Sequence, residues 1–260
     1  MKPPPSARLI RGHRLAQGLV GAWTMAANGG LQVFDLSENG QIGTFSGNLV
    51  WTSGKFGSSV NFPGGGADWI DLSSLTSYAH TQPHTYTAWV YPTDNAQGYY
   101  WIINNGNAAP LGSSLVLHQV GGDLHVGFFY QGGNAIVSGS THVPLNTWSH
   151  IAAVSLGQTV TFYVNGIFDE TDATGSYDAG NLNPRIGAWQ NGSFPFYGLI
   201  DIPSVYNRAL SASEVAKLYP EPFCMFERKA RTALLSGYAV PPVGNAGIMT
   251  TNTGFWGPTF

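Results

Sequence analysis

Charged side chains are scarce in this sequence. Only 10% of its 260 residues are Asp, Glu, Lys or Arg, against about 25% in an average globular protein. A coiled coil or a long helical bundle needs many more charged residues, so these classes are excluded. The sequence also lacks any run of about 18 consecutive apolar residues, which excludes a transmembrane helix and predicts no membrane insertion.

Cysteine is nearly absent as well, because Cys224 is the single one in the chain. An internal disulfide is therefore impossible, and the fold must rest on an apolar core, which a chain of this length can supply. Glycine and proline are abundant instead, with 34 and 16 residues, and aromatic residues make up 13%. A disordered chain would not carry so many aromatic rings. Turn-forming and aromatic residues together favour an all-β domain.

The eleven basic residues are placed unevenly along the chain. Seven of them lie in residues 1–14 and 228–231, whereas residues 15–220 hold four basic and twelve acidic residues. A basic charge at both ends predicts that the ends contact something acidic. The alternative is that they are solvated arms. The apolar stretch after residue 14 is interrupted by Gln17 and glycines, so no signal peptide is expected.

Three regions are predicted. Residues 1–17 open with three prolines in their first five positions and are expected to form a basic N-terminal arm. Residues 18–220 show short strand-like segments and then a capping box, Ser211 with Glu214, which predicts one short helix. Residues 221–260 hold four prolines, five glycines and six aromatics. They are interpreted as an extended C-terminal arm that packs either on a partner or on its own domain.

Segments of alternating or continuous apolar residues, separated by turn residues, recur through the central region. This spacing is typical of a β-sandwich or jelly roll. Asn165-Gly166 and Gly121-Gly122 each separate two such segments and predict hairpins with two-residue turns. Strands are expected at 18–25, 58–62, 68–72, 84–91, 99–104, 114–119, 124–130, 147–155, 159–164, 184–188 and 195–206.

Residues 18–219 contain, in this order, the segments GLVGAWTM, DLSENGQIG, GKFGSSVNFPGGGADWIDL, HTYTAWVYP, NTWSHIAAV, VTFYVNG and FYGLIDIPSVYNRALSASEVAKLY. In this string the sequence resembles the laminin-G-like branch of the concanavalin A-like lectin/glucanase superfamily. The resemblance implies a two-sheet antiparallel jelly-roll sandwich with one short C-terminal helix and extended terminal arms. The opening RGHRLAQGLVGAW is also similar to the start of laminin-G-like proteins encoded by tailed bacteriophages.

The resemblance further implies a Ca²⁺ site. In this family the ion often lies between an early Asp-containing loop and the aspartate of a G-x-I-D motif, and the matching residues are Asp35 and Asp201. Ca²⁺ takes about six to eight oxygen ligands, which loops supply as carboxylates and carbonyls. Ile202 stands where the family often has a second acidic residue, which lowers the charge available to the ion. The alternative is that both aspartates cap turns by accepting backbone hydrogen bonds.

Carbohydrate binding needs exposed aromatic faces beside a few amide or carboxylate groups. Two segments offer this combination: an expected strand with Trp101 and Asn104, and a glycine-flanked loop with Trp189, Gln190 and Asn191. The alternative is that the rings belong to the core, since a fold with 34 aromatic residues must bury most of them. Trp189 is the better ligand candidate because it lies in a loop.

Catalysis is not expected. Glucanases of this superfamily carry two carboxylates in an E-x-D-x-x-E strand motif, about 5 Å apart across the glycosidic bond, and this sequence has no such motif. Asp169, Glu170 and Asp172 lack that spacing and are interpreted as a solvated acidic hairpin strand. No G-x-S-x-G elbow occurs. The basic ends lack the motifs of a nucleic-acid module, so specific nucleic-acid binding is not expected either.

These observations predict a non-enzymatic structural or adhesion module of a larger assembly, such as a bacteriophage virion decoration or fibre-type protein. Its partners would be capsid or tail proteins, held through both arms, and cell-surface glycans bound by the jelly roll. A soluble carbohydrate-binding lectin module and a glycoside hydrolase are the alternatives. The residues expected to anchor a partner are Arg8, Arg11, Arg14, Phe223, Phe226, Arg228, Phe255, Trp256 and Phe260.

Overall fold

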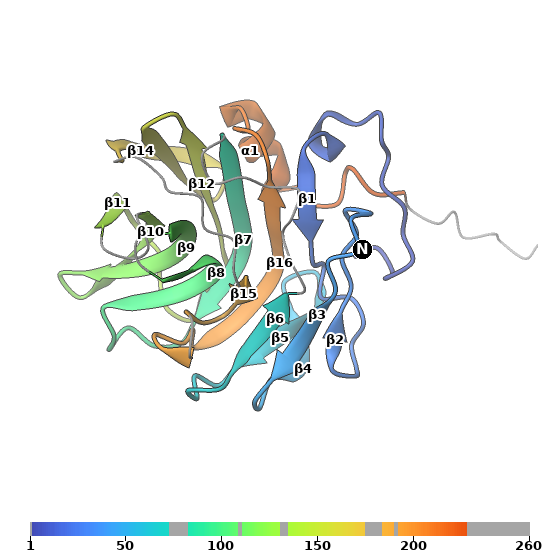
Figure 1. Cartoon of the computed structure of the whole chain (residues 1–260), viewed down its shortest axis with the longest axis horizontal. Helices are drawn as coiled ribbons and strands as arrows, with labels where there is room; N and C mark the ends of the chain where they lie inside the picture. Colours follow the sequence, from blue (N-terminus) through green and yellow to red (C-terminus); the bar gives the residue numbers. More distant parts are fainter. Residues whose placement is uncertain are drawn as a thin grey trace, which may run out of the picture. The chain divides into compact units, whose positions relative to one another are not determined.

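Two antiparallel β-sheets stack face to face in the computed structural model of the chain (Figure 1). The structure describes residues 2–72, 83–108, 111–130, 135–174, 184–189 and 192–227. The first sheet, sheet I, has the order β14 (Ile167–Ala173), β13 (Thr159–Val164), β12 (Ser149–Leu156), β7 (His84–Pro92), β16 (Gly198–Tyr206), β5 (Gly57–Phe62) and β4 (Val50–Gly54), and β1 (Leu19–Ala22) also pairs with β16.

The second sheet, sheet II, has the order β11 (Ala135–His142), β10 (Asp123–Tyr130), β9 (Leu111–Val120), β8 (Tyr99–Ala108), β15 (Arg185–Ile186), β6 (Trp69–Leu72), β3 (Gly43–Ser46) and β2 (Gln32–Val33). The helix α1 (Ala212–Leu218) follows the last strand, and a 3₁₀ turn, η1 (Arg14–Ala16), precedes the first. The expected all-β sandwich with one short C-terminal helix is thus confirmed. Among the described residues, no helix has the length and apolar character needed to cross a bilayer.

The main core fills the space between the two sheets. Successive side chains of a strand point to opposite faces, and in β7 Tyr86, Ala88 and Val90 face this core whereas Trp89 faces the outside of sheet I. Trp23 is fully buried in the main core, and its indole N–H donates to the backbone carbonyl of Gln41. The alternation expected for TYTAWVY is therefore confirmed.

A second core covers the outer face of sheet I around Trp89. It receives Leu15 from the N-terminal segment and Val215 from α1, and both side chains are at most 1% exposed. The N-terminal segment also pairs with the chain beyond α1, because Ile10 N donates to Met225 O at 2.8 Å. Residues 2–17 are therefore part of the domain, which corrects the expectation of a separate arm. The physical reason is that their apolar side chains complete this second core.

The beginning of the expected C-terminal arm packs in the same way. Phe223 and Phe226 are 7% and 3% exposed within the second core, and Phe223 makes an edge contact with Phe56. An isolated bridge joins Leu9 to Phe226. Up to residue 227 the chain thus follows the alternative of packing on its own domain. This corrects the expectation that the two phenylalanines anchor a partner, because rings buried in this way are not free to contact one.

His150 lies in the second core and gives it a dependence on pH. The side chain is 2% exposed, and its ring is 5.5 Å from that of Trp89. Burial lowers the pKa of His150 to about 3, from 6.5 in an exposed histidine. Below pH 6.5 the imidazole of His150 is therefore protonated in the unfolded chain, whereas in the folded chain it stays neutral until the pH approaches 3. Stability contributed by this group is present above that pH and is lost as the pH falls toward 3.

We therefore expect the free energy of unfolding to fall by about 2 kcal/mol from this group alone between about pH 7 and pH 5. Urea denaturation at the two pH values measures the change. The variant His150→Leu should lack this part of the pH dependence. The variant His142→Gln, whose imidazole is 50% exposed, should keep it. Equal pH dependence in wild type and His150→Leu would contradict the prediction.

Candidate functional site

The outer face of sheet II carries a cluster of stacked rings. In β8 the side chain of Tyr100 enters the main core, whereas those of Tyr99 and Trp101 point to the opposite face. Cross-strand pairing places Tyr99 beside His118 of β9. A β-turn segment after β15 adds two further rings. We call these residues the aromatic cluster: Tyr99, Trp101, His118, Phe129, Trp189 and Phe194.

Trp101 is the base of the aromatic cluster. It stacks on Phe129 with ring centroids 4.7 Å apart and on Trp189 at 5.7 Å. Trp101 is only 2% exposed, whereas Phe194 is 38% exposed and Trp189 and Tyr99 are half-buried. The sequence expectation that Trp101 contacts a ligand directly is therefore corrected. Trp189, Tyr99 and Phe194 supply the accessible ring surface, and Trp101 supports it from below.

Backbone hydrogen bonds fix the turn that carries Trp189. Trp189 N donates to Ser193 O at 3.0 Å, and Gly192 N donates to Trp189 O at 3.2 Å. The turn is joined to β8 because Trp101 N donates to Phe194 O at 3.3 Å. Phe194 has a φ of 51°, an uncommon conformation for a bulky residue. Backbone strain of this kind concentrates at functional sites, where the surrounding structure maintains it.

Gly192 is required where the turn approaches the loop before β6. Its φ is 75°, and a Cβ atom there would overlap the carbonyl oxygen of Gly66. We expect Gly192→Ala to lower the free energy of unfolding by about 1–3 kcal/mol, since both the φ and the contact are unfavourable. Thermal denaturation measures the loss. The matched control is Gly66→Ala, whose added Cβ meets nothing within 4 Å. An equal melting temperature for the two variants would contradict this account of the turn.

A polar rim borders the aromatic cluster on the β6 side. The strand register places Arg185 between Asn104 of β8 and Asp71 of β6, so the three side chains share the outer face. Arg185 Nε donates to Asp71 Oδ1 at 3.0 Å, and the guanidinium lies 4.3 Å from the ring centre of Trp69. We define the polar rim as Trp69, Asp71, Asn104 and Arg185.

Several buried donors on this face have no hydrogen-bond acceptor among the residues that the structure describes. They are Trp101 Nε1, Asn104 Nδ2, Arg185 Nη1 and Trp69 Nε1. Asn104 is 1% exposed, and its Oδ1 accepts from Ser114 Oγ at 2.9 Å, which fixes the amide orientation. Buried polar groups in proteins are nearly always hydrogen-bonded, so donors of this kind call for a specific explanation. A face with stacked rings and spare donors has the chemistry that a sugar requires.

His118 lies on the same face and contributes an uncharged ring. Burial, and secondarily the neighbouring His125, lower the pKa of His118. Its ring stacks on Tyr99 at 5.0 Å with an interplanar angle of 19°. The register also confirms that His118 and His125 are cross-strand neighbours. His118, Phe129, Trp69 and Arg185 were not predicted from the sequence as residues of this site. Strand alternation within DLHVGFFY and WIDL was the signal for Phe129 and Trp69.

Asp35 has the contacts of a turn-capping residue. Its Oδ1 accepts from Ala22 N and Ser37 N, both at 2.8 Å, and its Oδ2 accepts from Ser37 Oγ and from Gln41 N. Both carboxylate oxygens thus accept hydrogen bonds, from the last residue of β1 and from the loop that follows Asp35. The alternative reading of Asp35 as a turn cap describes this geometry.

Asp201 lies in a fully buried position beside an ammonium group. Lys2 Nζ is 2.5 Å from Asp201 Oδ1 and also bonds the carbonyl of Ser58. Burial raises the pKa of Asp201, and Lys2 opposes this rise. The described residues contain no group of three or more His, Cys, Asp or Glu side chains that could hold a metal. Asp35 and Asp201 therefore fit a Ca²⁺ ion poorly as they stand, and the ion stays a prediction.

The remaining sequence-predicted residues are placed as follows. Asp169 of β14 is not simply solvated: its Oδ1 accepts from the backbone and hydroxyl of both Ser140 and Thr141, which ties β14 to β11. This corrects the reading of a solvated strand at that position.

Arg8, Arg11 and Arg14 are exposed, and Arg11 pairs with Glu38 at 2.7 Å. Outside the described residues lie Gln190, Asn191, Arg228, Phe255, Trp256 and Phe260.

Two stacked antiparallel sheets, with the strand orders given above, define a jelly-roll domain of the concanavalin A-like class. The chain belongs to the Concanavalin A-like lectin/glucanases superfamily, whose laminin G model matches residues 64–216. No curated protein matches the chain. The sequence-level family assignment is thus confirmed.

Solved structures share the fold at low identity. Domain 4 of AbnA, a GH43 extracellular arabinanase from Geobacillus stearothermophilus solved in complex with arabinotriose, is 21% identical with a TM-score of 0.62, and the match covers 77% of this chain and 98% of that one. The binding domain of Paraclostridial Mosquitocidal Protein 1 is 19% identical with a TM-score of 0.64, covering 81% and 54%. The receptor-binding domain of botulinum neurotoxin type G is 14% identical with a TM-score of 0.60, covering 79% and 52%. The match with this chain therefore spans about half the length of each of these last two binding domains.

Proposed function

We propose that this chain is a non-enzymatic glycan-binding module, and that the aromatic cluster and the polar rim form its binding face. The observation that carries the proposal is the juxtaposition of accessible rings with polar side chains at their edge. Trp189 and Phe194 present ring surface, while Arg185 and Asp71 of the polar rim have side chains that are 16% and 51% exposed. The apolar face of a sugar stacks on such rings, and its hydroxyl groups hydrogen-bond to polar side chains beside them.

The comparisons support the same class of function. Among the similar structures, the arabinanase domain is in complex with arabinotriose, and two others are the binding domains of toxins. The sequence also lacks the paired-carboxylate strand motif with which the glucanases cleave the glycosidic bond. The proposal therefore places this chain with the binding modules of its superfamily rather than with the hydrolases.

A glycan array that includes arabinotriose tests the proposed function. Wild-type protein should bind at least one glycan, and Trp189→Ala should bind none of them above background. The matched control is Phe168→Ala, which removes a ring that is 58% exposed on β14 of sheet I. It should bind like wild type. Running the array with added Ca²⁺ and with a chelator tests the expected ion. No hit in either condition would overturn the proposal, and release of reducing ends from a bound polysaccharide would favour the hydrolase alternative.

We further propose that the module is displayed by a larger assembly, in keeping with the similarity of its opening segment to bacteriophage proteins. Arg8, Arg11 and Arg14 remain exposed on the surface and suit an acidic neighbour. Because residues 223–227 belong to the domain, the informative deletion is 228–260. The shortened chain should keep the melting temperature of the wild type and fail to co-sediment with virions. Normal incorporation of the shortened chain would contradict the anchoring role.

A further inference from the structure

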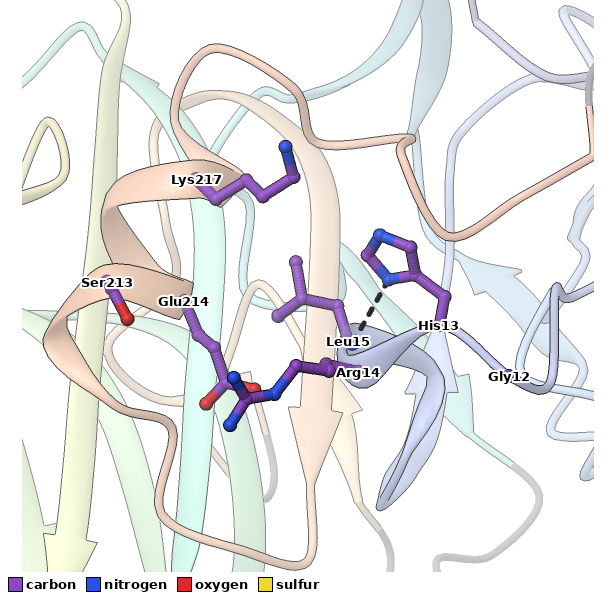
Figure 2. A pocket seen from close by; sticks show the side chains of 7 residues that line it. All are labelled: Gly12, His13, Arg14, Leu15, Ser213, Glu214 and Lys217. Atoms are coloured by element: carbon purple, nitrogen blue, oxygen red, sulfur yellow. Dashed lines mark hydrogen bonds between the residues drawn. The ribbon is translucent and has the colours of Figure 1, made fainter.

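A pocket of about 470 Å³ lies between the N-terminal turn η1 and helix α1, and it is lined by none of the residues of the aromatic cluster. Figure 2 shows that the residues of η1 and those of α1 face one another across it. Apolar atoms make up most of the lining surface, and the side chains of His13, Arg14, Ser213, Glu214 and Lys217 add polar groups to it. The pocket is lined by Gly12, His13, Arg14, Leu15, Ser213, Glu214 and Lys217.

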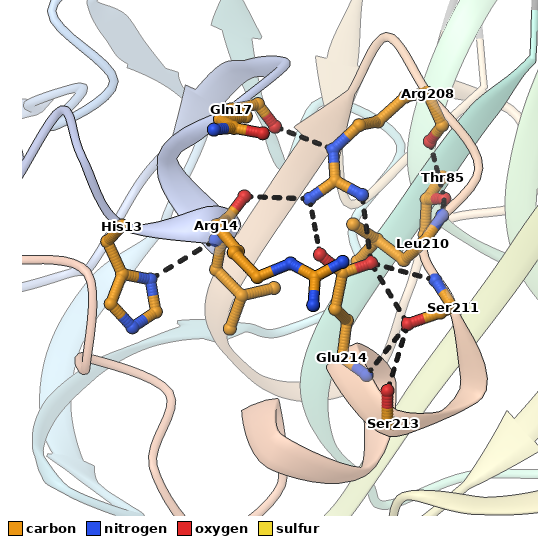
Figure 3. A network of polar contacts seen from close by, with 10 residues as sticks. His13, Arg14, Gln17, Thr85, Arg208, Leu210, Ser211, Ser213 and Glu214 are labelled. Carbon is orange, nitrogen blue, oxygen red and sulfur yellow. Dashed lines mark hydrogen bonds and ion pairs between the residues drawn. The ribbon is translucent and has the colours of Figure 1, made fainter.

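Arg208 holds the two walls of the pocket together (Figure 3). On one side its Nε donates to Gln17 O at 2.8 Å, and its Nη2 donates to Arg14 O at 2.9 Å. On the other side its Nη1 and Nη2 each donate to one carboxylate oxygen of Glu214, at 2.9 and 2.8 Å. A bidentate arginine–carboxylate pair is among the stronger and more specific polar contacts. The pocket is therefore fixed before any ligand enters.

The lining carries an excess of positive charge. The Arg208 guanidinium lowers the pKa of Glu214 to about 2, so this carboxylate stays ionised, and its charge is balanced by Arg208. Arg14 is exposed, and no ion pair is made by its guanidinium in the described part of the chain. Lys217 pairs with Glu221 at 3.0 Å, but both side chains are about half exposed. Exposed ion pairs of this kind contribute about 1 kcal/mol or less to stability, so another anion can readily replace Glu221 beside Lys217.

His13 adds an N–H donor. Its Nδ1 accepts a hydrogen bond from Leu15 N at 3.1 Å, so in the neutral ring the proton resides on Nε2. Figure 2 shows the second ring nitrogen on the side of the ring away from Leu15. His13, Arg14, Ser213 and Lys217, all of which carry hydrogen-bond donors, thus line one pocket.

We propose that this pocket binds a small oxyanion, meaning a carboxylate, sulfate or phosphate group. Donors of this kind match the oxygens of such groups. The same chemistry is offered by the acid group of a uronate sugar and by free inorganic phosphate. The site is independent of the proposed glycan face, because it uses none of the residues of the aromatic cluster or the polar rim.

NMR titration of the ¹⁵N-labelled full chain tests the proposal, with sodium phosphate, sodium sulfate and sodium glucuronate as probes at constant ionic strength. The amides of residues 12–15 and 213–217 should shift with saturation for at least one probe. The double variant Arg14→Gln/Lys217→Gln should bind that probe at least tenfold more weakly. The matched control is Arg11→Gln on the same segment, whose side chain is 83% exposed and does not line the pocket. It should bind like wild type.

The probes also identify the source of the anion. Saturation by glucuronate alone would support an acidic sugar, and saturation by phosphate alone would support the free ion. Linear shifts with every probe, or equal weakening in Arg11→Gln, would overturn the proposal. Both substitutions of the double variant lie on the surface and leave the Arg14 carbonyl that Arg208 binds, so the folded spectrum should persist. Loss of this site would leave the glycan array result unchanged, which keeps the two proposals distinguishable.

Discussion

Replacing Trp101 with alanine is expected to lower the free energy of unfolding by about 3–5 kcal/mol. The indole is 2% exposed and stacks on Phe129 and on Trp189. Its removal leaves a cavity under the turn that carries Trp189, because the surrounding backbone is fixed by strand pairing and cannot collapse fully. Glycan binding should be lost in the same variant, since the accessible rings lose their support. Urea denaturation followed by circular dichroism measures the change in stability.

The informative comparison is Trp189→Ala. Trp189 is half-buried, so its removal should cost about 1 kcal/mol of stability while it removes the accessible stacking surface. Comparison of the two variants would then distinguish the structural support of the aromatic cluster by Trp101 from the direct contact of Trp189 with the glycan. A loss below about 1 kcal/mol for Trp101→Ala would contradict the role of Trp101 as the base of the aromatic cluster.

Replacing Arg208 with methionine is expected to destabilise the domain by about 3 kcal/mol at neutral pH. Methionine keeps an apolar stem of similar length but removes the bonds to Gln17 O, Arg14 O and the Glu214 carboxylate. The Glu214 side chain is 12% exposed, so without Arg208 it would hold a charge with little access to water. The matched control is Lys217→Met on the same helix, which breaks an exposed pair and should cost less than about 0.5 kcal/mol.

The pH dependence of this loss follows from Glu214. Because its folded pKa is about 2 and the ordinary value is 4.5, the stabilisation is present above 4.5 and is lost as the pH falls toward 2. The difference between wild type and Arg208→Met should therefore shrink on acidification across that range. Urea denaturation at several pH values measures it. A constant difference would mean that the carboxylate does not mediate the effect.

Short sequence motifs predicted the elements whose conformation is determined by residues close together in the sequence, namely a hairpin turn and the start of the helix. Asn165 and Gly166 have φ values of 52° and 77°, both positive as a type I′ turn requires, and Val164 pairs with Ile167 across them. Ser211 and Glu214 form the expected capping box. No comparable local signal marks β2, β3, β4 and β11. β2 has only two residues, and such short strands exist because neighbouring strands offer partners, which a local pattern does not encode.

The candidate site was predictable only in part for the same reason. Trp189 could be recognised from its place in a glycine-flanked loop. The burial of Trp101, however, depends on the register of β8, β9 and β10, which brings Phe129 and His118 beside it. The N-terminal segment was likewise expected to be an arm because of its prolines and basic residues. Leu15 and its apolar neighbours pack into the second core instead, a long-range contact that no local pattern shows.

The central claim is that the aromatic cluster binds a sugar, and an equilibrium titration tests it most directly. The array's strongest glycan is titrated into wild type, Trp189→Ala and Phe168→Ala, with tryptophan fluorescence or heat as the signal. The account predicts that Trp189→Ala binds about 30-fold more weakly or worse, as expected for a central aromatic contact of about 2 kcal/mol. Phe168→Ala should match wild type. Equal affinity of Trp189→Ala and wild type would contradict the account.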